Sequence, residues 1–257
     1  MKIALFSDVH ANLPALQALF NDFDERKPDA VYCLGDLVGY NIWPNEVVQA
    51  IRKRGIPTIA GNYDFGVGRN SDDCGCAYKS EAEKTMGAQS IAFTNALIGN
   101  DERNYLRTLP AHLQLEFQLN NDQLFLLMVH GSPRKINEYL FEDRDPKSML
   151  RLLEQSHADV LFFGHTHKPY HRIFEYEHNG KMAYRHAVNI GSVGKPKDGD
   201  ARACYAMITI HEDSSKYSKE SIEVEFIRVM YDVEKAAKAV EQSVLPNAYA
   251  DMLREAR

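Results

Sequence analysis

The chain begins with MKIALFSDVH at residues 1–10, where a short apolar run, Ile3–Phe6, stops at Asp8-Val9-His10. A continuous apolar run of this length is typical of a strand that is buried on both faces. Similar runs recur along the chain, and each ends in polar, glycine-containing sequence: Ala30–Leu34, Thr58–Ala60, Leu124–Val129, Val160–Phe163 and Ala187–Ile190. The recurrence predicts a core built from buried strands.

Helical patterns lie between several of these runs. We expect one helix after Asn12, one from the capping-box pair Ser80 and Glu83 to about residue 99, and one from Asp145-Pro146 towards residue 157. A polar cap at the helix start, or a proline in the first turn, satisfies or removes backbone N–H groups that would otherwise lack partners. Strand–helix alternation of this kind predicts an α/β core.

Other segments predict antiparallel pairing. Apolar and polar residues alternate over 113–119, and Asn120-Asn121-Asp122 is a candidate turn into the next strand. Asn179-Gly180 between 172–177 and 182–186 is a strong hairpin signal. Segments 203–210 and 222–229 indicate two more strands, and helices over 233–244 and 247–254 close the chain. We therefore expect two mixed β-sheets packed face to face, with helices outside.

Composition limits the possible functions. The 257 residues carry a formal net charge of −6 and have no long run of Lys and Arg, so we expect no nucleic-acid partner. The four scattered cysteines do not form a disulfide framework. The first apolar run is too short for a signal peptide, and no uncharged run approaches the ~20 residues that span a bilayer. We expect one cytoplasmic domain over 1–257, with no membrane partner and a helical segment from about 233.

Polar clusters follow five of the predicted strands. They are Asp8-Val9-His10, Gly35-Asp36, Gly61-Asn62-Tyr63-Asp64, His130-Gly131 and Gly164-His165-Thr166-His167. In open α/β sheets the carboxyl ends of strands form the ligand crevice, so we expect these clusters to converge on one site. Carboxylate, amide oxygen and imidazole without thiolate suit Mn²⁺, Fe or Zn²⁺.

Each cluster is weak evidence when it is taken alone. Asp-x-His is common, and Gly-Asp is an ordinary turn signal. Gly-His-Thr-His is moderately typical of metal sites. Their occurrence together, in this order and at strand ends, is hard to explain by turns and favours a metal centre.

The combined series resembles the calcineurin-like metallophosphoesterase family, and its bacterial branch of diadenosine-tetraphosphatase-like and small phosphodiesterase-like proteins in particular. The resemblance covers nearly the whole chain and implies a four-layer α/β/β/α sandwich. It also implies two transition-metal ions: one held by Asp8, His10 and His167, the other by Asn62, His130 and His165, with Asp36 bridging them. A bridging hydroxide would attack the phosphorus of a small phosphate ester or phosphoanhydride, such as a nucleotide or dinucleoside polyphosphate.

One position departs from the family pattern. Many members have histidine where this chain has Tyr63, and that histidine is thought to contact phosphate and to protonate the leaving group. A phenol of ordinary pKa about 10 is a poorer acid. Tyr63 either packs beside the site or donates a hydrogen bond to phosphate, and the sequence leaves both open.

The remaining functional assignments follow from the same motifs. We expect catalytic roles for Asp36, Asn62, Tyr63 and Asp64, and substrate binding by Asn62, Tyr63 and Arg134, which follows His130-Gly131 closely. Most other basic residues after the motifs, including Lys195 and Lys197, are expected at the surface. The rival functions are a nuclease and a non-catalytic protein-interaction scaffold, and the complete ligand set argues against the scaffold.

Overall fold

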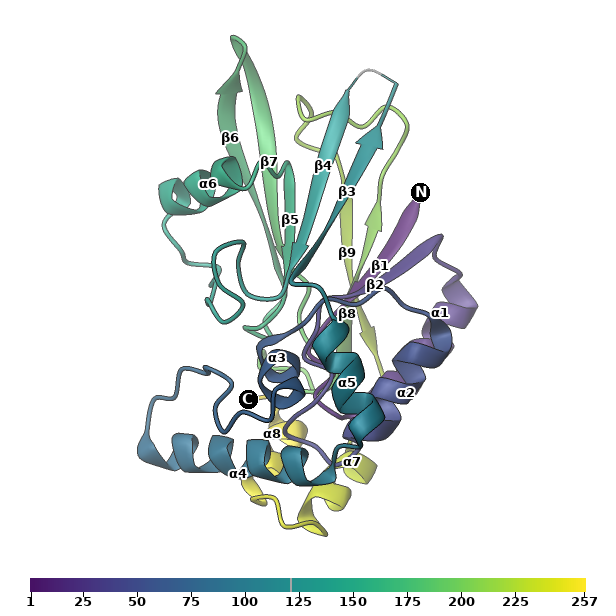
Figure 1. The fold of residues 1–257 in the computed structure, drawn as a ribbon. Coiled ribbons are helices and arrows are strands. Elements are labelled where there is room, and N and C mark those ends of the chain that lie inside the picture. The colour runs from purple at the N-terminus through teal and green to yellow at the C-terminus, as the bar shows by residue number, and fades with distance from the viewer. Residues whose placement is uncertain (121) are drawn as a thin grey trace.

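The computed structural model describes residues 1–120 and 122–257. Two β-sheets face each other, and helices cover their outer faces (Figure 1). One sheet has the order β2-β1-β8-β9, formed by Ala30–Cys33, Lys2–Phe6, Ala203–Thr209 and Glu223–Val229. The other has the order β3-β4-β5-β7-β6, formed by His112–Gln118, Gln123–Val129, Val160–Phe163, Lys181–Asn189 and Tyr170–His178.

Both sheets combine parallel and antiparallel pairs. In the first, β1 pairs in parallel with β2 and antiparallel with β8, which pairs antiparallel with β9. In the second, β5 lies between β4 and β7 in parallel register, and the antiparallel partners β3 and β6 form the edges. The carboxyl ends of the parallel strands β1, β2, β4 and β5 carry four of the five predicted polar clusters, and the fifth, Gly61–Asp64, lies at the start of α3.

The alternation of side chains along each strand explains the layers. In β1, Ile3 and Leu5 pack in the core between the sheets, whereas Ala4 and Phe6 pack against the helices outside. In β4, Leu126 again faces the core between the sheets. Successive residues of a strand point to opposite faces, so a run that is apolar throughout needs cover on both sides. The predicted α/β/β/α arrangement is confirmed.

Eight helices are present in the described residues: α1 (Leu13–Arg26), α2 (Pro44–Arg54), α3 (Asn62–Gly68), α4 (Glu81–Leu97), α5 (Asn100–Thr108), α6 (Pro146–Gln155), α7 (Val233–Glu241) and α8 (Ala248–Glu255). The three predicted caps form. Asn12, Ser80 and Asp145 each accept a backbone N–H from the first turn of α1, α4 and α6. Within the described residues, no helix has the length and apolar character needed to cross a membrane.

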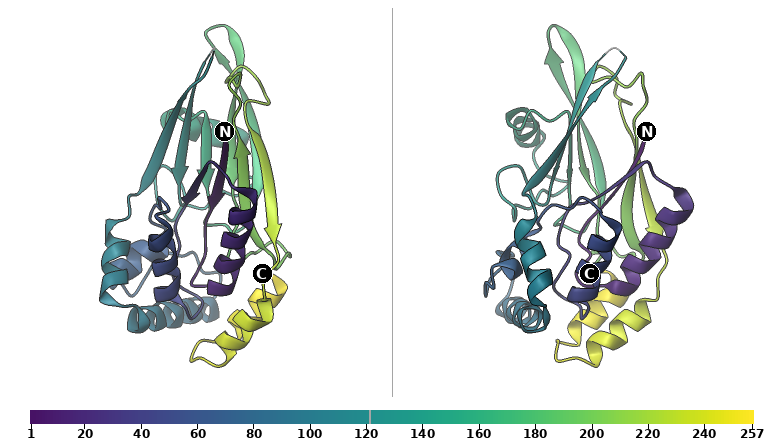
Figure 2. Two further views of the ribbon diagram at one scale, coloured as in Figure 1. Left: turned by 90° about the vertical axis from the view of Figure 1, so that its right-hand side faces the viewer. Right: turned by 45° about the vertical axis from the view of Figure 1, so that its right-hand side comes forward.

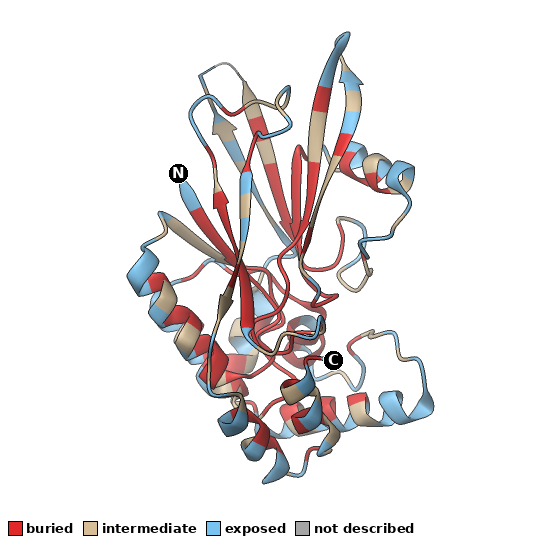
Figure 3. Cartoon of the chain, turned by 180° about the vertical axis from the view of Figure 1, so that it is seen from behind, coloured by how far each residue is buried: buried red, intermediate tan, exposed pale blue. Residues whose placement is uncertain are grey.

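The C-terminal helix pair lies at the same end of the molecule as α3 and α4 (Figure 2). Its core packs against side chains from the segment before α2 and from α4, among them Tyr40, Trp43 and Phe93. Buried residues extend from the strands into the loops that follow them, whereas the outward faces of the helices are exposed (Figure 3). The end of the molecule that carries the polar clusters is therefore enclosed by helices.

One predicted strand is wrong. Thr58–Ala60 forms only an isolated bridge, Cys33 to Thr58. The N–H of Ala60 turns away to the carbonyl of Pro110 (2.8 Å), and α3 begins two residues later, so no ladder can continue. Helices α2, α3 and α5 were not predicted. The turn predicted over Asn120-Asn121-Asp122 falls on residue 121, outside the described residues, although β3 and β4 pair on either side of it.

Close backbone contact at Gly35 brings two of the site loops together. Gly35 has φ +90°, and a Cβ built on it would lie 2.2 Å from the backbone nitrogen of Gly61. The carbonyl oxygen of Gly35 also accepts the N–H of Asp8 (2.9 Å). Gly35 therefore holds the loops after β1 and β2 against the start of α3.

We predict that Gly35→Ala lowers the free energy of unfolding by about 2–5 kcal/mol, because it combines a left-handed backbone with overpacking. Gly55→Ala is the matched control: Gly55 has φ +64°, but nothing lies within 4 Å of a built Cβ. The control should lose only about 1–2 kcal/mol. Thermal unfolding of both variants measures the difference, at roughly 2–4 °C per kcal/mol for a chain of this size. Equal melting temperatures would contradict the proposed backbone contact.

Candidate metal centre

All seven predicted metal ligands are buried in one place. Asp8, His10, Asp36, Asn62, His130, His165 and His167 are each between 0% and 4% exposed. Six of them lie in the loops after β1, β2, β4 and β5. These strands end at the same edge of the two sheets, so the six side chains converge. Asn62 instead occupies the first turn of α3, and the bridge at Thr58 brings that helix to the same edge.

Five of these seven residues have a left-handed backbone. The φ angles are 56° for Asp8, 47° for His10, 54° for Asp36, 65° for His165 and 62° for His167. Such values are uncommon outside glycine, and each costs of order 1–3 kcal/mol unless the surroundings enforce it. The concentration of strain at one buried edge is typical of a functional site rather than of ordinary turns.

The side chains form two adjacent groups. Asp8, His10 and His167 form one, with their candidate ligand atoms all within 4.8 Å of one another. Asp36, His130 and His165 form the other, within the same limit. These groups correspond to the two ligand sets that the family resemblance implies.

Backbone carbonyls fix the tautomers of three imidazoles. The Nδ1 atoms of His10, His130 and His167 lie at hydrogen-bond distance from the carbonyl oxygens of Val38 (3.0 Å), Leu34 (2.8 Å) and Lys195 (2.6 Å), respectively. A carbonyl oxygen can only accept, so each Nδ1 must carry the proton. In the neutral imidazole the Nε2 lone pair is then free to bind a metal, as in metal sites where a hydrogen bond orients the histidine.

The free acceptor atoms face one another. The Nε2 atom of His167 lies 3.1 Å from that of His10 and 3.1 Å from Oδ1 of Asp8. Among the described residues, Oδ1 of Asp8 and Nε2 of His165 have no hydrogen-bond partner although both are buried. Lone pairs held this close repel each other, and burying them without a partner is costly. The arrangement requires a cation between them.

Asn62 presents its amide oxygen to the second group. Its Nδ2 donates to the carbonyl oxygen of Cys74 (2.8 Å) and lies 3.4 Å from Sγ of Cys76. This orientation leaves Oδ1 facing Nε2 of His130 at 3.1 Å. The amide oxygen therefore faces the same point as Nε2 of His130, and Asn62 fits as an oxygen donor to a cation there.

Asp36 lies between the two groups. Its Oδ2 is 3.3 Å from Nε2 of His130 and 3.6 Å from Nε2 of His10. Its Oδ1 is occupied, because it accepts the N–H of Tyr63 at 2.9 Å. The geometry therefore fits a bridge that uses Oδ2 for both metal ions.

The electrostatics of the centre favour cations. Burial opposes ionisation of Asp8, but the nearby imidazoles of His167 and His10 hold its pKa well below the usual range. Burial also opposes protonation of His130, yet the carboxylates of Asp36 and Asp8 raise its pKa to about 10. For His167, burial and then the charge of Lys197 lower the pKa to about 3. The carboxylates thus attract positive charge, and His167 stays neutral as a ligand must.

Asp64 does not reach the two groups. Its carboxylate accepts the N–H groups of Leu37 (2.9 Å) and Gly61 (3.0 Å), and it thereby ties the loop after β2 to the first turn of α3. Burial and the charge of Asp36 raise its pKa to about 7. In this arrangement Asp64 positions its neighbours rather than touching a reacting atom.

Tyr63 is also buried, at 1% exposed. Its ring packs edge-on against His10, with 5.5 Å between ring centroids, and against Tyr40 at 4.8 Å. Its hydroxyl has no hydrogen-bond partner within the part of the chain that the structure describes. The ring packs beside the site, and the hydroxyl is buried without a partner, so the structure agrees with packing and does not decide whether the hydroxyl binds phosphate.

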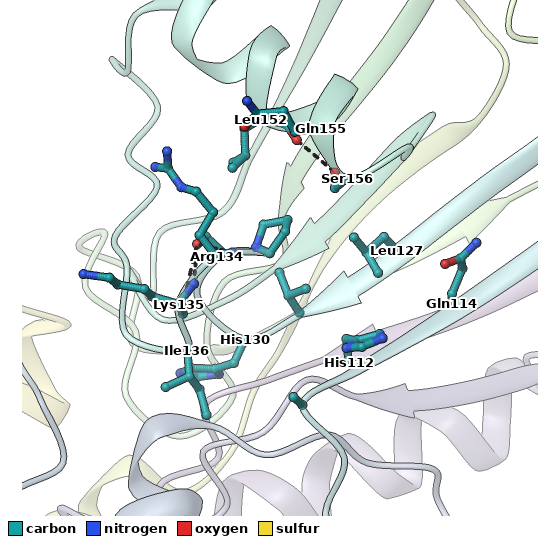
Figure 4. A pocket seen from close by; sticks show the side chains of 14 residues that line it. His112, Gln114, Leu127, His130, Arg134, Lys135, Ile136, Leu152, Gln155 and Ser156 are labelled. Carbon is teal, nitrogen blue, oxygen red and sulfur yellow. Dashed lines mark hydrogen bonds between the residues drawn. The ribbon is translucent and has the colours of Figure 1, made fainter.

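Arg134 lies farther from the centre than its place in the sequence indicates. Its guanidinium is about half exposed and pairs with Glu138. In the cavity of about 410 Å³ that it lines with His130, its side chain points away from the His130 ring (Figure 4). A substrate would have to displace Glu138 in order to use it.

Several residues at the site were not predicted. Tyr139 lies over His165 with 4.0 Å between ring centroids, and Asn41 donates to the carbonyl oxygen of His10 (2.8 Å). Lys195, expected at the surface, is only 4% exposed. None of these three residues belongs to a metal-ligand motif, so the sequence held no specific signal for their place at the site.

The donor set fits transition metals. It offers carboxylate oxygen, an amide oxygen and four imidazoles, with no thiolate within the two groups. This mixture suits Mn²⁺, Fe or Zn²⁺ rather than Mg²⁺, which prefers oxygen alone. The orphaned atoms of Asp8 and His165 are the observation that carries this fit.

Comparison of the sequence with known proteins also indicates a phosphoesterase. Residues 1–213 match the model of the calcineurin-like phosphoesterase superfamily domain. An uncharacterized protein of Methanocaldococcus jannaschii is 32% identical over 98% of this chain and 96% of its own length. A UDP-2,3-diacylglucosamine hydrolase of Klebsiella pneumoniae is 26% identical over 72% of this chain and 89% of its own.

Solved structures show the same fold. A metallophosphoesterase from Sphaerobacter thermophilus aligns with a TM-score of 0.71 at 24% identity, covering 100% of both chains. A hypothetical protein from Pyrococcus horikoshii aligns with a TM-score of 0.74 at 21% identity, covering 98% of this chain and 97% of its own. Since the family model and the archaeal relative extend over most of its length, the chain belongs to the calcineurin-like phosphoesterase superfamily and is a metal-dependent phosphoester hydrolase.

Proposed function

We propose that the protein hydrolyses a small phosphate ester or phosphoanhydride with two transition-metal ions held by the seven buried side chains. Asp8, His10 and His167 would hold one ion, and Asn62, His130 and His165 the other, with Asp36 shared. The main support is the set of acceptor atoms of Asp8, His10 and His167, which face each other at about 3.1 Å with no donor between them. When bound, two such ions lower the pKa of a water, orient the phosphate and neutralise developing charge.

The protein's own residues hold this arrangement rigid. Backbone carbonyls orient His10, His130 and His167, and the N–H of His165 donates to Oδ2 of Asp8 (3.1 Å). Asp64 fixes the loop that carries Asp36. Ligands fixed before the substrate binds need no reorganisation during the reaction, and this lowers its barrier.

The opening beside the site suits a small molecule. A cavity of about 610 Å³ is lined by Cys76 and Tyr139, which contact Asn62 and His165, and by Arg134, Lys135 and Glu138. Ligand pockets for small molecules typically have this size. The acidic net charge of −6 argues against a long anionic polymer as substrate. The name of the Klebsiella relative refers to a UDP compound. The diphosphate of UDP is a phosphoanhydride, which belongs to the proposed substrate class.

A hydrolysis panel on protein reconstituted with Mn²⁺ tests this function. It should contain phosphomonoesters, phosphodiesters, nucleoside diphosphates, dinucleoside polyphosphates and nucleic acid. We expect turnover of small substrates that is lost on metal removal and restored by Mn²⁺. Preferred cleavage of nucleic acid, with strongly salt-dependent binding, would favour the nuclease instead. Absence of turnover throughout would favour the scaffold.

We predict that Asp36→Asn is the most damaging conservative change at the centre. An amide loses the charge that holds two cations together, so turnover should fall at least about 10²-fold. Metal analysis should show fewer ions per chain, and the circular dichroism spectrum should stay unchanged. Asp159→Asn is the matched control, since Asp159 is also a buried carboxylate and accepts the N–H of Phe125. Near-normal turnover of Asp36→Asn would show that Asp36 is not the bridge.

A second prediction concerns leaving-group protonation at Tyr63. Acid catalysis matters most for a basic alkoxide and little for an aryl or anhydride leaving group, which departs as a stable anion. Positioned acid catalysis contributes ~10²–10⁴-fold where it is needed. With tyrosine here, the native protein should favour aryl over alkyl phosphodiesters, and Tyr63→His should speed the alkyl ester selectively.

Measurement of kcat/KM for both esters in native protein, Tyr63→His and Tyr63→Phe tests this prediction. Tyr63→Phe should change little if the ring only packs, and should weaken turnover if the hydroxyl binds phosphate. Equal turnover of both esters by the native protein would mean that another group supplies the proton. Product release must first be shown not to limit the rate.

A further inference from the structure

Lys195 is a buried lysine with no acidic partner among the described residues. It is 4% exposed, and its ammonium contacts Sδ of Met252 (3.6 Å) and stands 5.1 Å from the ring centroid of Tyr40. Glu83 is close enough to act on its charge, but the Glu83 carboxylate is not within ion-pair distance and accepts the N–H of Lys79 instead. A buried ammonium is normally paired with an acid, and the described residues leave the Lys195 amine without one.

The backbone around Lys195 is tied to the metal ligands. The N–H of Gly194 donates to the carbonyl oxygen of Asp8 (2.9 Å), and a Cβ on Gly194 would lie 1.7 Å from the carbonyl oxygen of Val9. The carbonyl oxygen of Lys195 accepts Nδ1 of His167 (2.6 Å). The position of Lys195 is therefore fixed by the same contacts that orient the ligands.

Lys197 brings a second cation to the same side. Its N–H donates to the carbonyl oxygen of His167 (3.3 Å), and its charge acts on the imidazole of His167 and on the thiol of Cys76. It makes no ion pair within the described parts of the chain. The two lysines thus carry positive charge to the His10–His167 side of the centre.

Aromatic side chains connect this positive charge to the metal ligands. The Tyr40 ring, which lies beneath the Lys195 ammonium, is edge-on to His10 with 4.7 Å between ring centroids. Tyr249 of α8 also packs against Tyr40, with 5.3 Å between ring centroids. The Tyr40 ring therefore contacts the Lys195 ammonium, the C-terminal helix and the metal ligand His10.

We propose that Lys195 and Lys197 form an anion subsite that binds a second negatively charged phosphoryl group, directly bonded through oxygen to the phosphorus that reacts. The inference rests on the proposed function and narrows its substrate class to phosphoanhydrides. In the hydrolysis, the oxygen of one water bonds to the attacked phosphorus while the bridging P–O bond breaks, and the protons of that water pass to the products and solvent. The lysines then stabilise the departing phosphate as an anion.

This subsite also gives a reason for the tyrosine at position 63. A phosphate leaving group is stable as an anion, so cations beside it replace the acid that an alkoxide would need. Lysine is a common phosphate ligand because its ammonium acts as a compact point charge. The absence of the usual histidine and the presence of two unpaired lysines therefore point to the same leaving group.

Calorimetric binding of two probes to the Mn²⁺-loaded protein tests the subsite without depending on turnover. Methylenediphosphonate carries two adjacent phosphonates that cannot be hydrolysed, whereas methylphosphonate carries one. We expect the native protein to bind the diphosphonate more tightly. Lys195→Met and Lys197→Met should each lower the ratio of the two affinities at least about 10-fold, while free Mn²⁺ is kept in excess to prevent chelation.

Lys53→Met is the matched control, because Lys53 is an exposed lysine on α2 and lines neither the centre nor the opening beside it. Its affinity ratio should equal that of the native protein. A ratio unchanged in both subsite variants, or reduced equally in the control, would overturn the subsite. If Lys195→Met fails to fold, Lys197→Met decides the matter. If the protein hydrolyses esters but the subsite variants leave the ratio of the two affinities unchanged, only the subsite is rejected. If no substrate in the panel is hydrolysed, the hydrolytic function itself is rejected.

Discussion

Three imidazoles that donate their Nδ1 protons to backbone carbonyls impose the main constraint on this molecule. The hydrogen bonds turn the Nε2 atoms of His10 and His167 towards each other and towards Asp8, and they turn Nε2 of His130 towards Asp36. All five side chains are buried. Such a cluster is repulsive unless cations occupy it. The sheets, the strained loops and the covering helices together hold these acceptors close despite that repulsion.

The strain and the lysines follow from this constraint. Left-handed residues such as Asp8 and His165 let the chain reverse direction right after a buried strand and keep the side chain within the centre. The segment that accepts Nδ1 of His167 also carries Lys195, so orienting a ligand and placing a cation are done by the same residues. In the proposed subsite, metal binding and recognition of the neighbouring phosphate would therefore depend on the same segment.

Much of this site could be predicted from the sequence, because ligands at strand ends form local patterns such as Asp8-Val9-His10. The strand at Thr58–Ala60 could not be excluded, since its failure depends on a hydrogen bond from Ala60 to distant Pro110. The burial of Lys195 depends on Met252 of α8, which no local pattern reveals. The orientation of Tyr63 likewise depends on packing against Tyr40. Contacts between distant segments decided each feature that the sequence left open.

The central claim is that two cations relieve the repulsion among these acceptors. Anomalous diffraction from crystals of Mn²⁺-loaded protein tests it most directly. The account predicts two peaks about 3.5–4 Å apart, one among Asp8, His10 and His167 and the other among Asn62, His130 and His165, with Asp36 between them. A single peak shared by both groups, or peaks outside them, would contradict it.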